Sequence, residues 1–481
     1  MMMSNNKCVP TSPFFIAHQE GIQKTVDALS RDFSFVSIFG TDCEGVSYQA
    51  QKSGVEVRDS MWTDRGFVVR VFHEGQYFEH SFNQLSVGSE DRLVKTIRDL
   101  VIGSAPLLSQ GFSSTQYPLV REEPLKGEWN ASVESLPGDL SPEGKIERLR
   151  AIVRKGLEQS PEVVDVKAVY EEVFVRKMYC STKRNLMQSY LWSQGYVIPI
   201  VRRGEKTQFA YGSFSDREGP IQLGEMDLMA PQIIDECLML LDAQKVHPGA
   251  YDVICSPEIT GLIAHEAFGH GVEMDMFVKE RAKAREYLGK PIASSIVQMR
   301  DGAAVHNTVS SYWFDDEGVL ASNTLIIENG ILKTGICDQL SALRLGTQPT
   351  GNGKRQSFAN KAYTRMTNTF FEPGLDHLDD MIHSIEHGFL LKRMMSGMED
   401  PKNWGIQCMV LYGQEIRNGA FTGVIVSPVI MTGYVPDLLQ SITMVSDDFE
   451  LFGSGACGKG YKEFVKNANG GPYIRCKARL G

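Results

Sequence analysis

The chain has 481 residues and a formal net charge of -10, from 49 Lys and Arg against 59 Asp and Glu. A chain of this length rarely folds around one hydrophobic core, so we expect two or three domains. Hydrophobic residues make up 42% and charged residues 22%, which is typical of folded proteins and excludes disorder as the main state. The chain is acidic overall and contains no long run of basic residues, so nucleic acid is not an expected partner.

The N-terminal sequence does not resemble a secretory signal, because it lacks a basic segment followed by a continuous apolar run. We also find no apolar run of membrane-spanning length, so we expect a cytoplasmic protein with no membrane partner. The nine cysteines form no CxxC pair. They therefore indicate neither a disulfide framework nor a four-cysteine zinc site.

The first half of the chain predicts a mixed α/β domain over residues 1–247. Residues 19–31 have a helical pattern, and residues 33–82 alternate between apolar and polar positions as strands do. Ser, Pro, Gly and Glu are frequent over residues 104–143, which predicts a long loop or insertion. Two further strand regions and a helix are predicted after it, at 168–175, 190–201 and 231–244.

The second half begins after the break at His247-Pro248-Gly249. A short apolar strand, Tyr251–Cys255, precedes Ser256-Pro257, a pair typical of a helix start. Asn-Gly dipeptides at 329–330 and 418–419 stand between strand-like runs and predict two hairpins. The fold class is therefore predicted to be α+β, with a β-rich domain over residues 248–481 that carries the helix.

That helix contains an HExxxH motif, formed by His265, Glu266 and His270. Neutral imidazole is a preferred zinc ligand. A glutamate beside the first histidine can take a proton from a water molecule activated by the metal. The motif therefore predicts a zinc site with Glu266 as the catalytic base of a hydrolase.

The five-residue spacing of the two histidines does not suit a regular α-helix. Five residues turn about 500°, which leaves the two side chains roughly 140° apart. Either the helix contains a π-bulge, or it ends early and His270 comes from the turn beyond it. Gly269 and Gly271 flank the second histidine and permit either distortion.

Other interpretations of the histidines remain open at this point. The motif can also be the end of an amphipathic helix with two exposed histidines. His383 and His387 have the easier i,i+4 spacing, but no glutamate follows the first of them. The run Gly351-Asn352-Gly353-Lys354-Arg355 resembles a phosphate loop, yet it lacks the first glycine and the final Ser or Thr of the Walker A pattern.

Two histidines require at least one more ligand. Cys255 precedes the motif by ten residues of helix, roughly 15 Å, and is out of reach. Cys457 lies in a glycine-rich run, residues 453–460, whose backbone can approach a metal closely. A buried free cysteine is the alternative interpretation, and Cys408, Cys476 or a carboxylate would then be the next candidates.

Four ordered segments of the C-terminal half resemble the TldD/PmbA metalloprotease family, and in particular its TldD-like subunits. They are His265–Glu273, Gly351–Arg355, Arg365–Thr369 and Gly455–Lys459. The resemblance implies zinc bound by the two motif histidines and the cysteine of the last segment, with the motif glutamate as general base. The role of the Arg365 segment does not follow from the sequence.

The same resemblance implies an N-terminal α/β domain, a β-rich C-terminal domain and a dimer that encloses the sites. The dimer would contain two like chains, or this chain and a PmbA-like partner without the motif. The implied substrates are small unfolded peptides, which we expect to be hydrolysed by a zinc-activated water. Two alternatives remain, namely a zinc amidase or esterase and a metal-stabilised scaffold without turnover.

Overall fold

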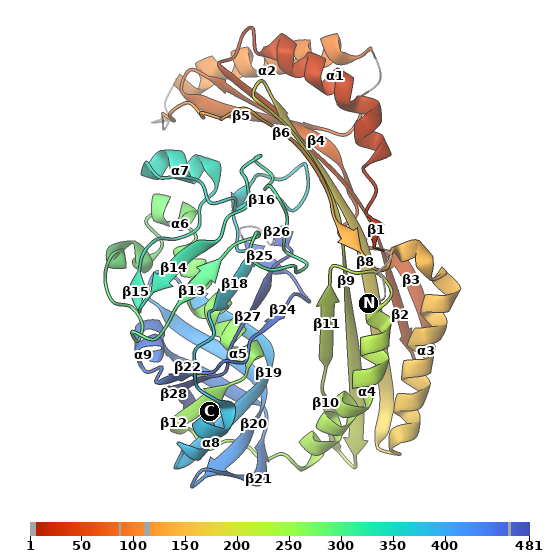
Figure 1. The fold of residues 1–481 in the computed structure, drawn as a ribbon, viewed down its shortest axis with the longest axis vertical. Coiled ribbons are helices and arrows are strands. Elements are labelled where there is room, and N and C mark those ends of the chain that lie inside the picture. Colours follow the sequence, from red (N-terminus) through yellow and green to blue (C-terminus); the bar gives the residue numbers. More distant parts are fainter. Residues whose placement is uncertain (1–5, 86–87, 110–115, 460–462) are drawn as a thin grey trace.

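The computed structural model describes residues 6–85, 88–109, 116–459 and 463–481, and it confirms the α+β class (Figure 1). One large sheet takes its strands from the N-terminal half, and the remaining large sheets take theirs from the chain after residue 248. Within the described residues, no helix combines the length and apolar character needed to span a membrane.

The N-terminal sheet has nine strands, with the order β10-β9-β8-β2-β4-β5 and with β3, β6 and β11 paired at its sides. Its long central strands are antiparallel, and their residues are largely buried. The strands are β2 (Phe35–Gln51), β3 (Gly54–Asp59), β4 (Asp64–His73), β5 (Gln76–Phe82), β6 (Leu125–Asn130), β8 (Val163–Ser181), β9 (Arg184–Arg203), β10 (Lys206–Phe209) and β11 (Gly212–Asp216).

Four helices cover this sheet in two pairs (Figure 1). Helices α1 (Pro13–Leu29) and α2 (Glu90–Ser109) lie over one end of the long strands, and α3 (Pro142–Gln159) and α4 (Gln222–Met239) lie over the other end. Both α1 and α3 begin with a serine cap followed by proline, and the capping hydroxyl accepts a hydrogen bond from a first-turn amide.

Three predictions for this half differ from the structure. The first helix begins at Pro13, because Ser12 caps it upstream of the predicted start. The long loop predicted over residues 104–143 is wrong, because α2 ends at Ser109 and β6 pairs in parallel with β9; residues 110–115 lie outside the described residues. Pro231 lies inside α4 rather than at its start. Short elements complete the region: β1 (Lys7–Cys8), β7 (Ser132–Val133), and 3-10 turns at Pro137–Asp139 and Leu240–Asp242.

The C-terminal half contains a seven-stranded sheet with the order β12-β19-β20-β22-β28-β23, to which β21 adds. Strand β12 also pairs with β28, so five strands of this sheet close on themselves. The strands are β12 (Gly249–Cys255), β19 (His387–Asp400), β20 (Gly405–Arg417), β21 (Ala420–Val426), β22 (Val429–Tyr434), β23 (Met444–Val445) and β28 (Ile474–Leu480).

A six-stranded sheet with the order β15-β14-β13-β18-β27-β24 lies beside it, together with two small two-stranded sheets. Its strands are β13 (Met299–Asp301), β14 (Thr324–Glu328), β15 (Ile331–Leu332), β18 (Asn368–Phe371), β24 (Glu450–Phe452) and β27 (Ala468–Gly471). The small sheets pair β16 (Gly353–Lys354) with β17 (Tyr363–Thr364) and β25 (Cys457–Lys459) with β26 (Glu463–Val465). Short helices are α6 (Asp275–Val278), α7 (Gln339–Leu345), α8 (Leu378–His383), α9 (Val435–Gln440) and a 3-10 turn at Lys283–Tyr287.

Both hairpins predicted from Asn-Gly dipeptides are confirmed. Strands β14 and β15 join through Asn329-Gly330, and β20 and β21 join through Asn418-Gly419. All four turn residues have positive φ, at 51° and 77° in the first turn and at 49° and 78° in the second. Two consecutive positive φ values fit the twist of the strands, and Asn and Gly adopt them at least cost.

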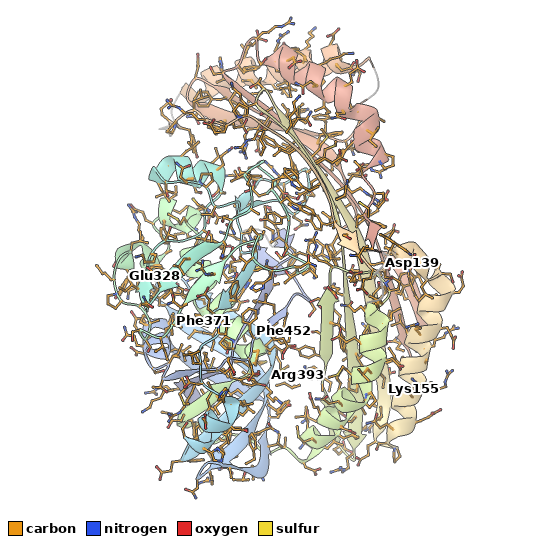
Figure 2. All side chains as sticks on the ribbon, viewed as in Figure 1. Asp139, Lys155, Glu328, Phe371, Arg393 and Phe452 are labelled. Carbon is orange, nitrogen blue, oxygen red and sulfur yellow. The ribbon has the colours of Figure 1, made fainter. Side chains whose placement is uncertain are left out.

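Side chains tie the two halves of the chain together along their boundary. Arg393 of β19 forms an ion pair with Glu236 of α4 at 2.9 Å, and Figure 2 shows Arg393 at this boundary. Further along it, Arg355 pairs with Glu79 of β5 at 2.5 Å. We propose that the domain boundary lies between residues 247 and 248, where the sheets separate and which these ion pairs cross.

Candidate metal centre

The motif helix lies between the two C-terminal sheets and changes geometry within the motif. Helix α5 (Pro257–Leu262) packs against β19 on one side and β27 on the other. Residues 263–269 continue it as a π-helix, and a 3-10 turn follows from His270 to Val272. The two distortions predicted from the spacing therefore occur together, because the π-helical stretch ends where His270 begins the next turn.

The π-helical hydrogen bond is what brings the two histidines together. The amide of His270 donates to the carbonyl of His265, a bond between residues five apart. A Cβ added to Gly269 would lie only 2.8 Å from the Ala264 carbonyl oxygen, so glycine permits this turn. Ser256 occupies the predicted N-cap position, but its hydroxyl makes no capping hydrogen bond.

The structure brings His265, His270 and Cys457 into one cluster, although the cysteine lies far along the chain in β25. Their candidate ligand atoms all lie within 4.8 Å of one another. Cys457 Sγ is 3.4 Å from His270 Nε2, and the two imidazole centroids are 5.1 Å apart. Ligand atoms around a tetrahedral zinc ion lie about 3.5 Å apart, so the donor set and its spacing fit this metal.

Each histidine ring has a polar partner on its Nδ1 side. Glu273 Oε2 lies 3.1 Å from Nδ1 of His270, and Asn467 Nδ2 lies 3.2 Å from Nδ1 of His265. Zinc-binding histidines usually donate their second ring N–H to an acceptor such as a carboxylate, which fixes the orientation of the ring. Glu273 is such an acceptor for His270, whereas the Asn467 amide nitrogen is a donor to His265.

Glu273 also connects His270 to the strand that carries Cys457. Lys459 of β25 donates to Glu273 Oε2 at 2.9 Å and to Asp275 Oδ1 at 2.6 Å. Arg365 donates to the Cys457 carbonyl oxygen at 2.5 Å. The Arg365 segment, whose role could not be predicted, thus holds the backbone of the candidate third ligand.

The electrostatics of the cluster favour a deprotonated thiol. Burial alone would raise the pKa of Cys457, but the two neighbouring histidines lower it well below its ordinary value. Burial alone would lower the pKa of His270. Glu273 and the Cys457 thiolate have the opposite effect and raise this pKa well above its ordinary value. A thiolate is the form of cysteine that binds zinc.

Glu266 lies beside the cluster with its carboxylate toward both rings. Its oxygens are 4.0 Å from His265 Nε2 and 3.9 Å from His270 Nε2. Burial raises the pKa of this carboxyl, although its side chain is still 25% exposed. Glu266 also lines an open pocket together with His270, Gly397 and Lys459. A raised pKa and access to a pocket suit a general base.

The other candidates from the sequence lie elsewhere. His383 contacts the Asp379 carbonyl, and His387, at the start of β19, pairs with Glu415 of β20. Cys255, Cys408 and Cys476 are buried in the core of the C-terminal half. In the part of the chain that the structure describes, His265, His270 and Cys457 are the only such group of three potential ligands. Lys354, in the run that resembles a phosphate loop, binds protein carbonyls.

Sequence reasoning missed Glu273, Lys459 and Asn467 as members of the site. Glu273 follows His270 at helical i,i+3 spacing, so that pattern could have suggested it as a partner. Asn467 is 202 positions from His265, and no local pattern connects the two.

A family model described as the PmbA/TldA metallopeptidase C-terminal domain matches residues 248–478, the region that holds the whole cluster. A metalloprotease of Methanocaldococcus jannaschii is 33% identical over 52% of this chain and 55% of its own length. The chain thus spans little more than half of that relative. A protein of Saccharolobus solfataricus, described as a zinc metalloprotease TldD homolog, is 29% identical over 64% of this chain and 69% of its own length.

The fold is also similar to a solved structure. TldE from Thermococcus kodakarensis superposes with a TM-score of 0.75 and covers 96% of this chain and 100% of its own. The two sequences are 16% identical, so this likeness concerns the fold alone.

Proposed function

The chain belongs, through its C-terminal half, to the TldD/PmbA metallopeptidase family, and we propose that it is a zinc-dependent peptidase that acts on small unfolded peptides. The observation that carries this proposal is the cluster of two imidazoles and one thiol within 4.8 Å, with a carboxylate beside it. Three protein ligands leave a fourth position open, as catalytic zinc sites require, whereas a structural site closes it with a fourth ligand.

His265, His270 and Cys457 would hold the metal; Glu273 orients the His270 ring, and Arg365 holds the backbone of Cys457. Bound zinc would lower the pKa of a water molecule to about 7 and polarise the substrate carbonyl. A thiolate and two neutral imidazoles would leave the site with one net positive charge.

Glu266 would act as the general base. It would take the proton from the attacking water and then pass it to the leaving amine, because its carboxylate lies near both ligand rings and borders the pocket. The raised pKa of Glu266 makes its carboxylate a stronger base than an exposed glutamate. The scaffold alternative has no use for a carboxylate in this position.

The assembly is part of the same proposal. A relative in the family is a TldD homolog, and a protein of the same fold is TldE, so we propose a dimer of like chains or a pair with a PmbA-like subunit. Light scattering of the purified chain, alone and with such a subunit, distinguishes the two assemblies.

The test of the proposed function is the Glu266→Gln variant. We expect it to keep zinc at the wild-type level and to cleave an unstructured peptide about 10² to 10⁴ times more slowly, the usual contribution of a general base. Metal content by elemental analysis and initial rates from the same preparations provide both readouts.

Wild-type rates in zinc-loaded Glu266→Gln would contradict the assignment of the base. A wild-type protein that binds zinc but cleaves only non-peptide amides or esters would replace the peptidase with the amidase alternative. A fourth protein ligand on the bound metal would favour the scaffold.

A further inference from the structure

Lys466 is a buried lysine, 8% exposed, whose ammonium gathers backbone carbonyls rather than carboxylates. It donates to the carbonyl oxygens of Gly453 and Gly455, both at 2.8 Å, and to Gln194 Oε1 at 2.5 Å. These three hydrogen bonds all go to uncharged oxygens. Burying a polar group is costly unless its hydrogen bonds are made, so these three bonds fix the position of the Lys466 amine.

The two carbonyls belong to the glycine-rich loop, residues 453–456, that leads directly into Cys457. A loop of this composition has little intrinsic preference for one conformation, and Gly455 has a φ of 106°. The position of the Cys457 thiol therefore depends on contacts that fix this loop from outside. Lys466 fixes two of its carbonyls at once.

The N-terminal half supplies the other contacts of the loop. Gln194 of β9 accepts a hydrogen bond from the Gly455 amide at 3.1 Å, in addition to the one from Lys466. Ser215 of β11 accepts one from the Gly453 amide at 2.9 Å. The N-terminal sheet thus binds the loop at two amides, while Lys466 binds two of its carbonyls.

The surroundings of Lys466 restrict its movement. Its Nζ lies 4.7 Å from the centroid of the Trp192 ring in β9 and 6.0 Å from that of Trp62, in the turn between β3 and β4. Its own carbonyl accepts hydrogen bonds from Lys354 and Ser310. The next residue is Asn467, which contacts His265, so the same backbone segment serves a second ligand.

We propose that Lys466 and Gln194 are positioning residues that hold the glycine-rich loop so that Cys457 can bind the metal, and that the N-terminal half thereby helps to build the metal site. This inference rests on the proposed function, because it assumes that zinc occupies the cluster. It assigns a role to a buried lysine that takes no part in the proposed chemistry.

The test compares zinc binding by Lys466→Met, Gln194→Ala and Gln188→Ala with that of the wild type. Gln188 is a matched control, since it also lies in β9 and bonds across to the C-terminal half, but at Phe314 and Trp313 rather than at the loop. We expect zinc affinity to fall about 10- to 100-fold in the first two variants, the usual effect of losing an outer partner of a metal ligand. The control should keep wild-type affinity.

Cobalt substitution supplies a second readout that a general loss of stability does not change. The thiolate-to-cobalt charge-transfer absorption should weaken in Gln194→Ala and Lys466→Met and should persist in Gln188→Ala. Thermal unfolding of the metal-free proteins identifies any variant that does not fold. If Lys466→Met does not fold, Gln194→Ala provides the test by itself.

Two results would overturn the inference while leaving the proposed function intact. One is wild-type zinc affinity and an unchanged cobalt spectrum in folded Gln194→Ala. The other is an equal loss of affinity in Gln188→Ala. A wild-type chain that binds no zinc would instead refute the proposed function.

Discussion

The candidate site has two walls that are built in different ways. The helical wall, residues 257–272, supplies His265, Glu266 and His270 from one continuous segment, whose π-helical turn sets their relative positions. The loop wall, residues 453–459, supplies Cys457 from a glycine-rich segment. The first wall is fixed by its own backbone hydrogen bonds. The second combines the short β25–β26 pairing with side chains from elsewhere, among them Arg365 and Lys466.

Because of this difference, different substitutions should weaken zinc binding at the two walls. Substitutions on the helical wall should act directly, because the ligands themselves occupy it. On the loop wall, the contacts that orient the ligand are spread over distant parts of the chain, so changes far from the metal should weaken binding. Glu273 joins the two walls, since it contacts His270 and Lys459.

The largest effect is expected when the helical wall loses both of its ligands. The double variant His265→Ala, His270→Ala should contain no zinc, while the wild type should contain about one ion per chain, because a lone thiolate cannot hold the metal. Elemental analysis after removal of loosely bound metal provides the measurement. Undiminished zinc in the double variant would move the site away from this cluster.

Loss of the ligand on the loop wall should be the next most severe change. Cys457→Ser replaces a thiolate by a neutral hydroxyl, a far poorer zinc ligand, so zinc affinity should fall by orders of magnitude while the fold persists. If Cys457 were only a buried thiol, the same change would cost roughly 1 to 3 kcal/mol of stability and leave zinc binding intact. Zinc titration and thermal melting of this one variant separate the two cases.

A smaller effect is expected at the connection between the walls. The charges of Lys459, His270 and Arg365 outweigh the effect of burial and hold the pKa of Glu273 far below its ordinary value, so it is ionised when it contacts His270. Glu273→Gln should lower zinc affinity about 10- to 100-fold, as removal of such outer partners usually does. Zinc competition with a chelator measures this change, and wild-type affinity would mean that the walls are positioned independently.

The smallest effect on zinc is expected from a contact outside both walls. Glu79 pairs with Arg355 at 2.5 Å and Arg70 at 2.8 Å; burial alone would raise its pKa, but these two arginines lower it from 4.5 to about 2. The pair should therefore stabilise the fold fully above about pH 4.5, and this contribution should be lost as pH falls through about 2.

At pH 7, Glu79→Gln should lower the free energy of unfolding by about 3 kcal/mol, as measured by urea denaturation. Zinc affinity should be unchanged. The difference from the wild type should shrink as the pH is lowered below 4.5, toward the folded-state pKa of about 2. A loss of zinc in this variant would mean that the metal site depends on contacts along the whole boundary between the halves.

The sequence predicted the helical wall better than the loop wall. The five-residue spacing of His265 and His270 does not place both side chains on one face of a regular α-helix. The π-helix is one of the two predicted ways to bring them together. The Asn-Gly hairpins were predictable because turn chemistry is local. The glycine-rich run suggested Cys457 as a candidate ligand, and the family resemblance favoured it over a buried free thiol. Its placement against the helix depends on contacts between distant segments.

The remaining differences have the same origin. The region 104–143 seemed irregular from its composition, but β6 obtains its hydrogen bonds from β9, about 60 positions away in the chain. Lys466 and Gln194 are separated by 272 positions, and no pattern in the sequence connects them. Long-range pairing of this kind is visible only in the folded chain.

The most direct test of the central claim is the coordination sphere of the metal in the wild-type protein, measured by X-ray absorption at the zinc edge. We expect one sulfur at about 2.3 Å, two imidazole nitrogens at about 2.0 to 2.1 Å and one further light atom from solvent. The sulfur signal should disappear in Cys457→Ser. A zinc shell without sulfur, or one with four protein ligands, would contradict the three-residue site and the catalytic function proposed for it.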